Sequence, residues 1–93
     1  MFIWDPKKAI LNVEKHKVSI EEAATVFGDP NALDWKDLEH SGMELRFKRL
    51  GISFERRILT VAYTIRRTAN GNKAIRVIST RTASRKERKA YAG

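Results

Sequence analysis

The C-terminal part of the sequence carries a density of arginines that suits phosphate binding. Planar guanidinium groups match phosphate oxygens in geometry and in charge, so several of them close together favour a phosphate site. A single arginine on a half-buried strand has an ordinary alternative, as a solvated side chain or as one partner of an ion pair. The cluster predicted around one hairpin and one helix start consists of Arg66, Arg67, Arg76, Arg81, Arg85 and Arg88.

Two stretches hold groups that could move protons. Lys15-His16 closes the first predicted helix, and His40 stands four residues before Glu44 and six before Arg46, a spacing that could supply a base and a cation. Each histidine also has a structural interpretation, His16 as a cation at a helix C-terminus and His40 as an ordinary loop residue. No metal site is predicted, because the sequence contains no cysteine, HExxH or H-x-x-x-H motif.

Aromatic residues could bind a nucleic acid by stacking on its bases. In a small domain, however, an aromatic side chain usually belongs to the core. We expect this of Trp4, Phe27, Phe47 and Tyr63. Tyr91 is a candidate for base stacking, because it falls on a basic terminal helix.

Length and charge limit the classes of protein to consider. Ninety-three residues predict a single domain spanning residues 1–93. The formal net charge is +8, and residues 1–55 hold eight Lys or Arg against ten Asp or Glu, whereas residues 56–93 hold eleven against one. This basic part favours a nucleic acid, an acidic protein or an anionic membrane as partner. The lack of cysteine, of a membrane-length apolar run and of a secretory signal predicts a cytoplasmic protein that does not enter a membrane.

The first elements are a strand and a helix. Phe2–Trp4 is predicted to be an edge strand, and Asp5-Pro6 an N-cap followed by a proline in the first helical turn. Ala9, Ile10 and Val13 then share one side of the helix, which predicts that this side faces the core.

Capping boxes predict two further helices. Ser19 and Glu22 have the required spacing and open a helix that Gly28-Asp29-Pro30 ends. Ser84 and Glu87 have the same spacing and open a terminal helix that reaches about residue 92.

The chain between these helices has the pattern of strands. Apolar and polar residues alternate from Glu44, a turn follows at residues 51–55, and Asn70-Gly71 is a hairpin signal. The predicted strands are a short one about Trp35 and longer ones from residue 44, over residues 57–65 and over residues 74–81. If the last strand is regular, Arg76 and Arg81 leave it on opposite faces.

The element order predicts an α+β fold of two layers. We expect an antiparallel sheet of about four strands, with N-terminal helices and a short C-terminal helix.

A longer pattern links the residues collected so far. It comprises Trp4-Asp5 with Lys8 and Asn12, Lys15-His16, Glu22-Ala23 to Phe27, Asp29-Pro30, His40, Glu44-x-Arg46, Gly51, Leu59-x-Val61-x-Tyr63-Thr64, and Ile75-Arg76-x-Ile78-Ser79-x-Arg81-x-Ala83 leading to Arg88 and Tyr91. In this order and spacing the sequence resembles the BrnT family of toxins from bacterial type II toxin-antitoxin systems. It departs from the family pattern at Val77, where isoleucine is usual, and at Thr80, where alanine is usual.

The resemblance implies a RelE-like fold and a ribonuclease that cleaves RNA and arrests translation and growth. It also implies neutralisation by a BrnA-like antitoxin with a DNA-binding end, in a hetero-oligomer that binds operator DNA. No cofactor is implied. The basic, cysteine-free composition independently suits RNA phosphates.

A metal-independent endoribonuclease needs a base, an acid and cations, because the RNA 2′-hydroxyl attacks the neighbouring phosphate. We assign charge stabilisation to Arg76 and Arg81, with Arg46 and Lys15 as electrostatic support. Acid and base work is assigned to His16, His40 or Glu44, without a choice among them. RNA binding is assigned to Lys15, Arg66, Arg67, Arg85, Arg88 and Tyr91.

Two alternatives explain the same charge. A non-catalytic nucleic-acid-binding or co-repressor module needs the arginines but not the histidines. A structural protein could use the basic surface to dock an acidic partner.

Overall fold

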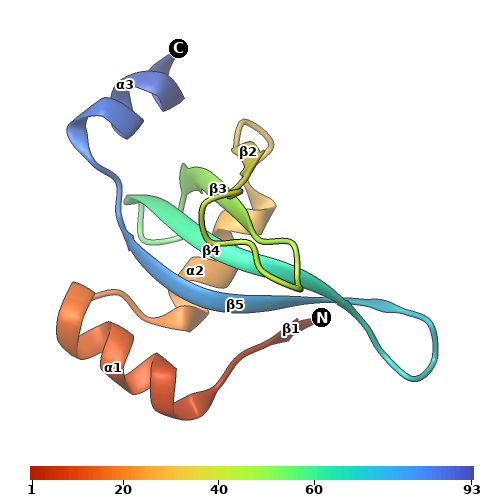
Figure 1. The fold of residues 1–93 in the computed structure, drawn as a ribbon. Helices are drawn as coiled ribbons and strands as arrows, with labels where there is room; N and C mark the ends of the chain where they lie inside the picture. The colour runs from red at the N-terminus through yellow and green to blue at the C-terminus, as the bar shows by residue number, and fades with distance from the viewer.

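The computed structural model describes all of residues 1–93 as one sheet with three helices. In chain order the elements are β1 (Phe2–Ile3), α1 (Pro6–His16), α2 (Ile20–Thr25), the 3₁₀ turn η1 (Val26–Gly28), β2 (Leu33–Lys36), β3 (Phe47–Ile52), β4 (Ile58–Arg67), β5 (Lys73–Thr82) and α3 (Arg85–Ala92). The strands lie in the order β1, β5, β4, β3, β2 (Figure 1). Every neighbouring pair is antiparallel except β1 with β5, which is parallel.

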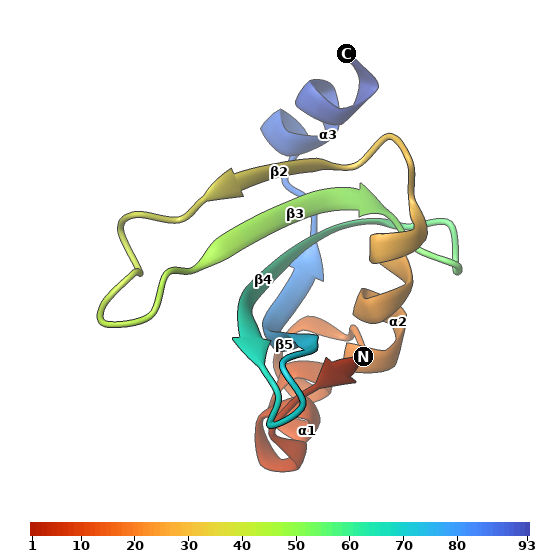
Figure 2. The same ribbon diagram turned by 90° about the vertical axis from the view of Figure 1, so that its right-hand side faces the viewer.

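The helices occupy different sides of the sheet. Figure 2 shows α2 against one face, α1 beyond the β5 end of the sheet, and α3 projecting past the sheet at its other end, where it contacts β3. The predicted α+β class is confirmed, and the sheet has five strands where about four were expected. No helix of the structure is long and apolar enough to cross a membrane.

The core is one cluster of aliphatic side chains extended by aromatic rings. Phe27 meets Tyr63 edge-on with 5.0 Å between ring centroids, and Phe47 stacks on Tyr63 at 5.4 Å. Trp4 packs against the cluster from its margin. The prediction that these aromatics belong to the core is therefore confirmed. The aliphatic members are Val18, Ile20, Ala23, Val26, Leu59, Val61 and Val77.

The two predicted capping boxes differ in outcome. In α3 the Ser84 hydroxyl accepts the Glu87 N–H, and the Glu87 carboxylate accepts the Ser84 N–H at 2.8 Å. In α2 the Ser19 hydroxyl accepts the Glu22 N–H, but the Glu22 carboxylate binds Arg57 instead of the cap backbone. The second half of the α2 prediction was wrong, because the fold brings a guanidinium that competes for the carboxylate.

Helix α1 faces the sheet with a different side from the predicted one. The helix begins after its Asp5 cap, as expected. Ile10 and Val13, predicted to face the core, are 62% and 45% exposed, and only Ala9 of the predicted set packs against it. The buried residue of α1 is the polar Asn12. Apolar periodicity failed here because the helix is fixed to the sheet by a hydrogen-bonding group.

The Asn12 carboxamide binds main-chain groups of two segments. Its Nδ2 donates to the carbonyl oxygens of Val18 and Thr80, both at 2.9 Å, and its Oδ1 accepts the Thr80 N–H at 3.0 Å. Strand β1 ends at Ile3, which pairs with Arg76, so β1 does not extend along β5 as far as Thr80. Asn12 therefore supplies at Thr80 the pairing that a neighbouring strand would give.

Strand β5 is not regular. Ala62 pairs with Ser79 but Tyr63 pairs with Val77, so the register shifts by one and Ile78 is the extra residue of a bulge. Beyond the shift Arg76 pairs with Thr64, and before it Arg81 pairs with Thr60. Thr60 and Thr64 lie on the same face of β4, and paired residues share a face. Arg76 and Arg81 therefore leave the same face. Opposite faces were expected only of a regular strand, and the bulge makes β5 irregular.

Gly51 lies inside β3 and not in the predicted turn. A side chain could not fit there, since a Cβ would stand 2.9 Å from both Asp29 Oδ2 and Val26 Cγ1. The turn comes later, where the Arg56 N–H donates to the Ser53 carbonyl and Arg56 adopts a φ of 63°.

We predict that Asn12→Ala lowers the free energy of unfolding by roughly 2–4 kcal/mol, because it leaves buried groups of Thr80 and Val18 without partners. Urea denaturation followed by circular dichroism measures the change. Glu14→Ala, on the exposed side of α1, serves as the control. A loss of under about 0.5 kcal/mol for Asn12→Ala, the range of ordinary surface changes, would contradict the role given to this contact.

Candidate active site

The sheet face opposite the core presents small side chains on β4. Thr60, Ala62 and Thr64 alternate with the core residues Leu59 and Val61. We call the face that carries these three residues the open face. Its small central side chains form a floor, which the longer side chains of neighbouring strands surround.

A pocket of about 210 Å³ lies on the open face. Three groups able to carry positive charge line it from three elements: His16 from the end of α1, Lys48 from β3 and Arg81 from β5. The remaining lining residues are small, namely Thr60, Ala62, Ser79 and Thr80. Two residues predicted to do chemistry, His16 and Arg81, thus meet at one pocket.

His16 reaches the pocket through the contact made by Asn12. The two residues are four apart and lie on the same side of α1. Because the Asn12 carboxamide fixes this side against β5, His16 is held at the pocket one turn later. Lys15 lines an adjoining hollow together with Ser79.

Arg81 is held by a carboxylate from α3. Its two terminal nitrogens donate to the two oxygens of Glu87 at 2.7 and 3.0 Å. This pairing lowers the pKa of Glu87 to about 2. Glu87 is also the capping residue that binds the Ser84 N–H, so the geometry of Arg81 depends on the first turn of α3.

A histidine and a carboxylate pair beside the pocket. His40 Nδ1 lies 3.0 and 3.1 Å from the two oxygens of Asp37, and Lys48 Nζ lies 4.0 Å from Asp37 Oδ2. Burial raises the pKa of Asp37, but the hydrogen bond from His40 and the positive charges of His40 and Lys48 outweigh it, and the pKa lies below its usual value. A carboxylate that fixes one ring nitrogen leaves the other available for proton transfer. Lys48 connects this pair to the pocket, since it contacts both.

Four other predicted residues lie around the open face and on its hairpin. Arg76 is half-buried, and its side chain forms no hydrogen bond or ion pair within the protein, so its guanidinium is available to a ligand. Arg66 pairs with Glu44 at 3.1 Å, which occupies the carboxylate that we considered as a base. Arg67 lies exposed at the end of β4, and Arg46 is half-buried just before β3.

The residues predicted on α3 divide into two groups. Arg85 is exposed, and Arg88 donates to the Ala83 carbonyl at 2.8 Å while remaining exposed. Tyr91 donates its hydroxyl to the buried Asp29 at 2.6 Å, and this hydrogen bond raises the pKa of Tyr91. Tyr91 therefore fastens α3 to the loop after η1 and is not among the residues that line the pocket.

Sequence reasoning missed three residues of this site. Lys48 could have been found, because it shares one face of the alternating strand after Glu44 with Arg46, which was selected. Asp37 stands three residues before His40, and Glu87 is the only acidic residue in residues 56–93. The sequence does not indicate which basic group each carboxylate binds, because that depends on the fold.

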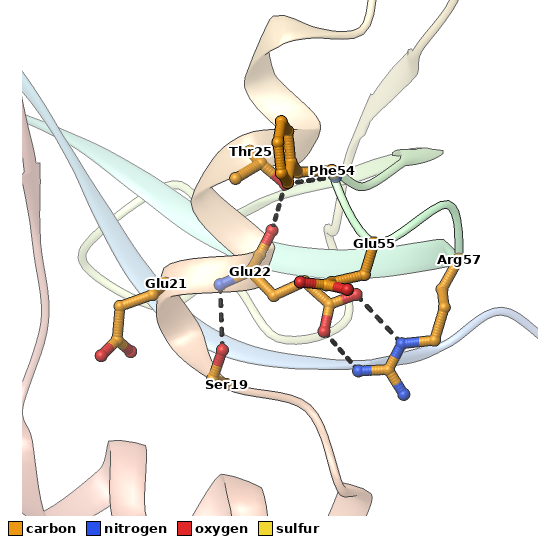
Figure 3. Close-up of a pocket in the computed structure, with 7 residues that line it drawn as sticks. All are labelled: Ser19, Glu21, Glu22, Thr25, Phe54, Glu55 and Arg57. Carbon is orange, nitrogen blue, oxygen red and sulfur yellow. Dashed lines mark hydrogen bonds and ion pairs between the residues drawn. The ribbon is translucent and has the colours of Figure 1, made fainter.

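A second, larger hollow lies between α2 and the β3–β4 turn (Figure 3). Its centre is the ion pair of Glu22 with Arg57, and Glu21 and Glu55 add negative charge around it. Acidic walls repel RNA phosphates, and none of the predicted site residues lines this hollow. We therefore place the candidate active site at the open face.

The open face can bind an anion and move protons. Lys48, Arg81 and Arg76 can stabilise negative charge on a phosphate, and the imidazole rings of His16 and His40 can donate and accept protons. No group of three or more His, Asp or Glu side chains is placed so that it could hold a metal ion.

We predict that the free energy of unfolding of Glu87→Gln falls less on acidification than that of the wild type. A carboxyl whose pKa falls from 4.5 to about 2 on folding stabilises the protein above pH 4.5, and this stabilisation is lost as the pH falls towards 2. Because the Arg81–Glu87 pair is partly exposed, we expect Glu87→Gln to lower the free energy of unfolding at neutral pH by only roughly 1–2 kcal/mol.

Urea unfolding at pH 7, 5, 4 and 3 measures the effect. The difference between wild type and Glu87→Gln should be similar at pH 7 and pH 5 and shrink at pH 4 and pH 3. Glu21→Gln, at an exposed position without an ion pair, is the control. A difference that is as large at pH 3 as at pH 7 would contradict the assignment.

Comparisons with known proteins agree with the sequence pattern. Residues 4–87 match the family model described as ribonuclease toxin, BrnT, of type II toxin-antitoxin system. The crystal structure of the Brucella abortus ribonuclease toxin BrnT is similar, with a TM-score of 0.63, 23% sequence identity, and coverage of 91% of this chain and 99% of that one. Among curated proteins no sequence matches this chain. The family model spans most of the chain, so the chain belongs to the BrnT family of ribonuclease toxins from type II toxin-antitoxin systems.

Proposed function

We propose that this chain is a metal-independent endoribonuclease toxin that cleaves RNA and thereby arrests translation and growth. The observation that carries the proposal is the meeting of His16, Lys48 and Arg81 at one pocket, next to the Asp37–His40 pair. Membership of a ribonuclease toxin family supports the reaction class.

The proposed reaction uses the RNA's own 2′-hydroxyl. A base removes the hydroxyl proton, the 2′-oxygen bonds to the neighbouring phosphorus, and the bond from phosphorus to the 5′-oxygen of the next nucleotide breaks. An acid gives a proton to that departing oxygen, which leaves a 2′,3′-cyclic phosphate and a 5′-hydroxyl. Negative charge grows on the phosphate oxygens meanwhile, and fixed cations stabilise it.

We assign the charge stabilisation to Arg81 and Lys48, which line the pocket, with support from Arg76, which lies further along β5 on the same face. Their partners hold Arg81 and Lys48 in position before RNA arrives, so little reorganisation is needed during the reaction. Proton transfer falls to His16 and His40. Glu44 is a weaker candidate because Arg66 already binds it.

RNA on either side of the cleaved bond is proposed to follow the basic rim. Arg46 and the exposed cations around the open face can bind phosphates without reading sequence. These are Lys15, Arg66, Arg85 and Arg88, and Arg67 adds a cation at the hairpin end of β4, on the opposite side of that strand from Arg66.

The proposed partner is a BrnA-like antitoxin encoded for the same type II system. It would carry a DNA-binding end, so the hetero-oligomer would bind operator DNA. We propose the cytoplasm as the location, since the RNA and the translation machinery are there.

We predict that the purified protein cleaves single-stranded RNA in EDTA and leaves cyclic phosphate ends, because its own side chains can supply charge stabilisation and proton transfer. His16→Ala and His40→Ala should each slow cleavage roughly 10²- to 10⁴-fold, and Asp37→Asn should slow it less. Gel electrophoresis of a labelled oligonucleotide measures the rates.

Circular dichroism shows whether each variant is folded. Cleavage that stops in EDTA and returns with one metal would overturn metal independence. If the wild-type protein binds RNA but does not cleave it, the result would favour the non-catalytic alternative.

We predict that expression of this chain alone arrests growth and that Arg81→Ala relieves the arrest, because loss of a charge-stabilising donor costs about 10²- to 10³-fold in rate. Arg76→Ala should also relieve it. Colony growth after induction is the measurement, with the exposed Lys7→Ala as control. If both arginine variants are folded and as toxic as the wild type, the assignment of Arg76 and Arg81 to the active site is wrong.

A further inference from the structure

Trp35 lies at the end of a row of side chains that crosses the sheet through the pocket. Strand pairing joins Trp35 to Lys48, Lys48 to Ala62, and Ala62 to Ser79. Paired residues share a face, so all four belong to the open face. The last three line the pocket, and Trp35 continues the row on the edge strand β2, one strand spacing of about 4.8 Å beyond Lys48.

The position of Trp35 is not explained by the core. Its side chain is 39% exposed, and it does not belong to the aliphatic cluster or to the aromatic pairs around Tyr63. Trp4, by contrast, packs against the core. An indole on a sheet edge that remains open to solvent keeps much of its surface available for another flat group.

The surroundings of Trp35 favour a nucleic acid as the flat group. Its cross-strand neighbour is Lys48, and the same face carries Arg81 and the unpartnered Arg76. An aromatic ring beside cations is the arrangement that binds single-stranded nucleic acids, since the cations hold phosphates while a base stacks on the ring. An acidic protein could also contact the same cations, but a nucleic acid accounts for the indole and the adjoining cationic pocket together, with a base on the ring and its phosphate in the pocket.

We propose that Trp35 is a base-stacking residue, which binds an unpaired base next to the phosphate held in the pocket. The inference rests on the proposed ribonuclease function and adds a substrate class, single-stranded RNA with a splayed base. Stacking accepts any base because every base has a flat face, so Trp35 contributes affinity and position more than sequence selection.

The test is a double-mutant cycle between Trp35 and individual bases. The probe is a short single-stranded oligodeoxynucleotide, which lacks the 2′-hydroxyl and is not cleaved, with an abasic residue placed at each position in turn. Dissociation constants are measured for the wild type, Trp35→Leu and Trp35→Phe. Leu33→Ala is the control for disturbing the strand, since Leu33 is an exposed apolar residue two positions away on the same face.

We expect Trp35→Leu to bind the intact probe about 5- to 150-fold more weakly, which corresponds to about 1–3 kcal/mol. With the abasic residue at one position, the probe should bind the wild type more weakly than the intact probe does, by a similar factor. Trp35→Leu should bind this abasic probe and the intact probe almost equally. Trp35→Phe should restore most of the binding, and Leu33→Ala should bind like the wild type. Quenching of tryptophan fluorescence by the probe should disappear in Trp35→Phe, because Trp4 remains in the core.

Three results would overturn the inference. If no abasic position separates the wild type from Trp35→Leu while RNA is still cleaved, the stacking role is wrong and the ribonuclease proposal stands. If Trp35→Leu loses binding of the antitoxin but not of the probe, the residue belongs to a protein interface. If the wild type binds neither the probe nor RNA, both proposals are wrong.

Discussion

The placement of α1 depends on the Asn12 carboxamide. Strand β1 pairs with only a short part of β5, and Asn12 takes the place of a strand neighbour at Thr80 by binding both its N–H and its carbonyl oxygen. A third hydrogen bond to Val18 fixes the connection to α2. One side chain thus sets the rotation of α1 about its axis, and with it the direction in which His16 points. The exposed Ile10 and Val13 show that apolar burial does not set this rotation.

The bulge in β5 is the second constraint, and it acts together with the first. Without the extra residue at Ile78, alternation would send Arg76 and Arg81 to opposite faces of the sheet. With it, both face the floor formed by Thr60 and Thr64. The bulge lies in the part of β5 that α1 covers, since Ile78 and His16 line a common hollow. The irregular strand and the polar helix contact together bring a histidine and two arginines to one surface.

Local signals predicted the elements well and the site only in part. The Ser84 cap, the Asn70-Gly71 turn and the alternation after Glu44 depend on neighbours in the sequence, so they can be recognised without the fold. The rotation of α1, the bulge and the pairing of Asp37 with Lys48 depend on contacts between distant segments. Lys48 can be recognised in the sequence as a basic strand residue, but its pairing with Ala62 is what places it at the pocket.

The cations of the open face differ in how freely they can bind RNA. Arg81 is paired with Glu87, Lys48 approaches Asp37, and Arg66 is paired with Glu44, whereas Arg76 has no partner. Carboxylates that hold cations in place reduce the net attraction for a polyanion, but they also remove the conformational freedom that binding would otherwise have to restrict. Paired cations therefore suit the reacting phosphate, where position matters most, and unpaired ones suit the first capture of RNA. By this argument the salt dependence of binding should come chiefly from Arg76 and from the rim cations that have no carboxylate partner, while the rate of cleavage depends on the paired cations at the pocket.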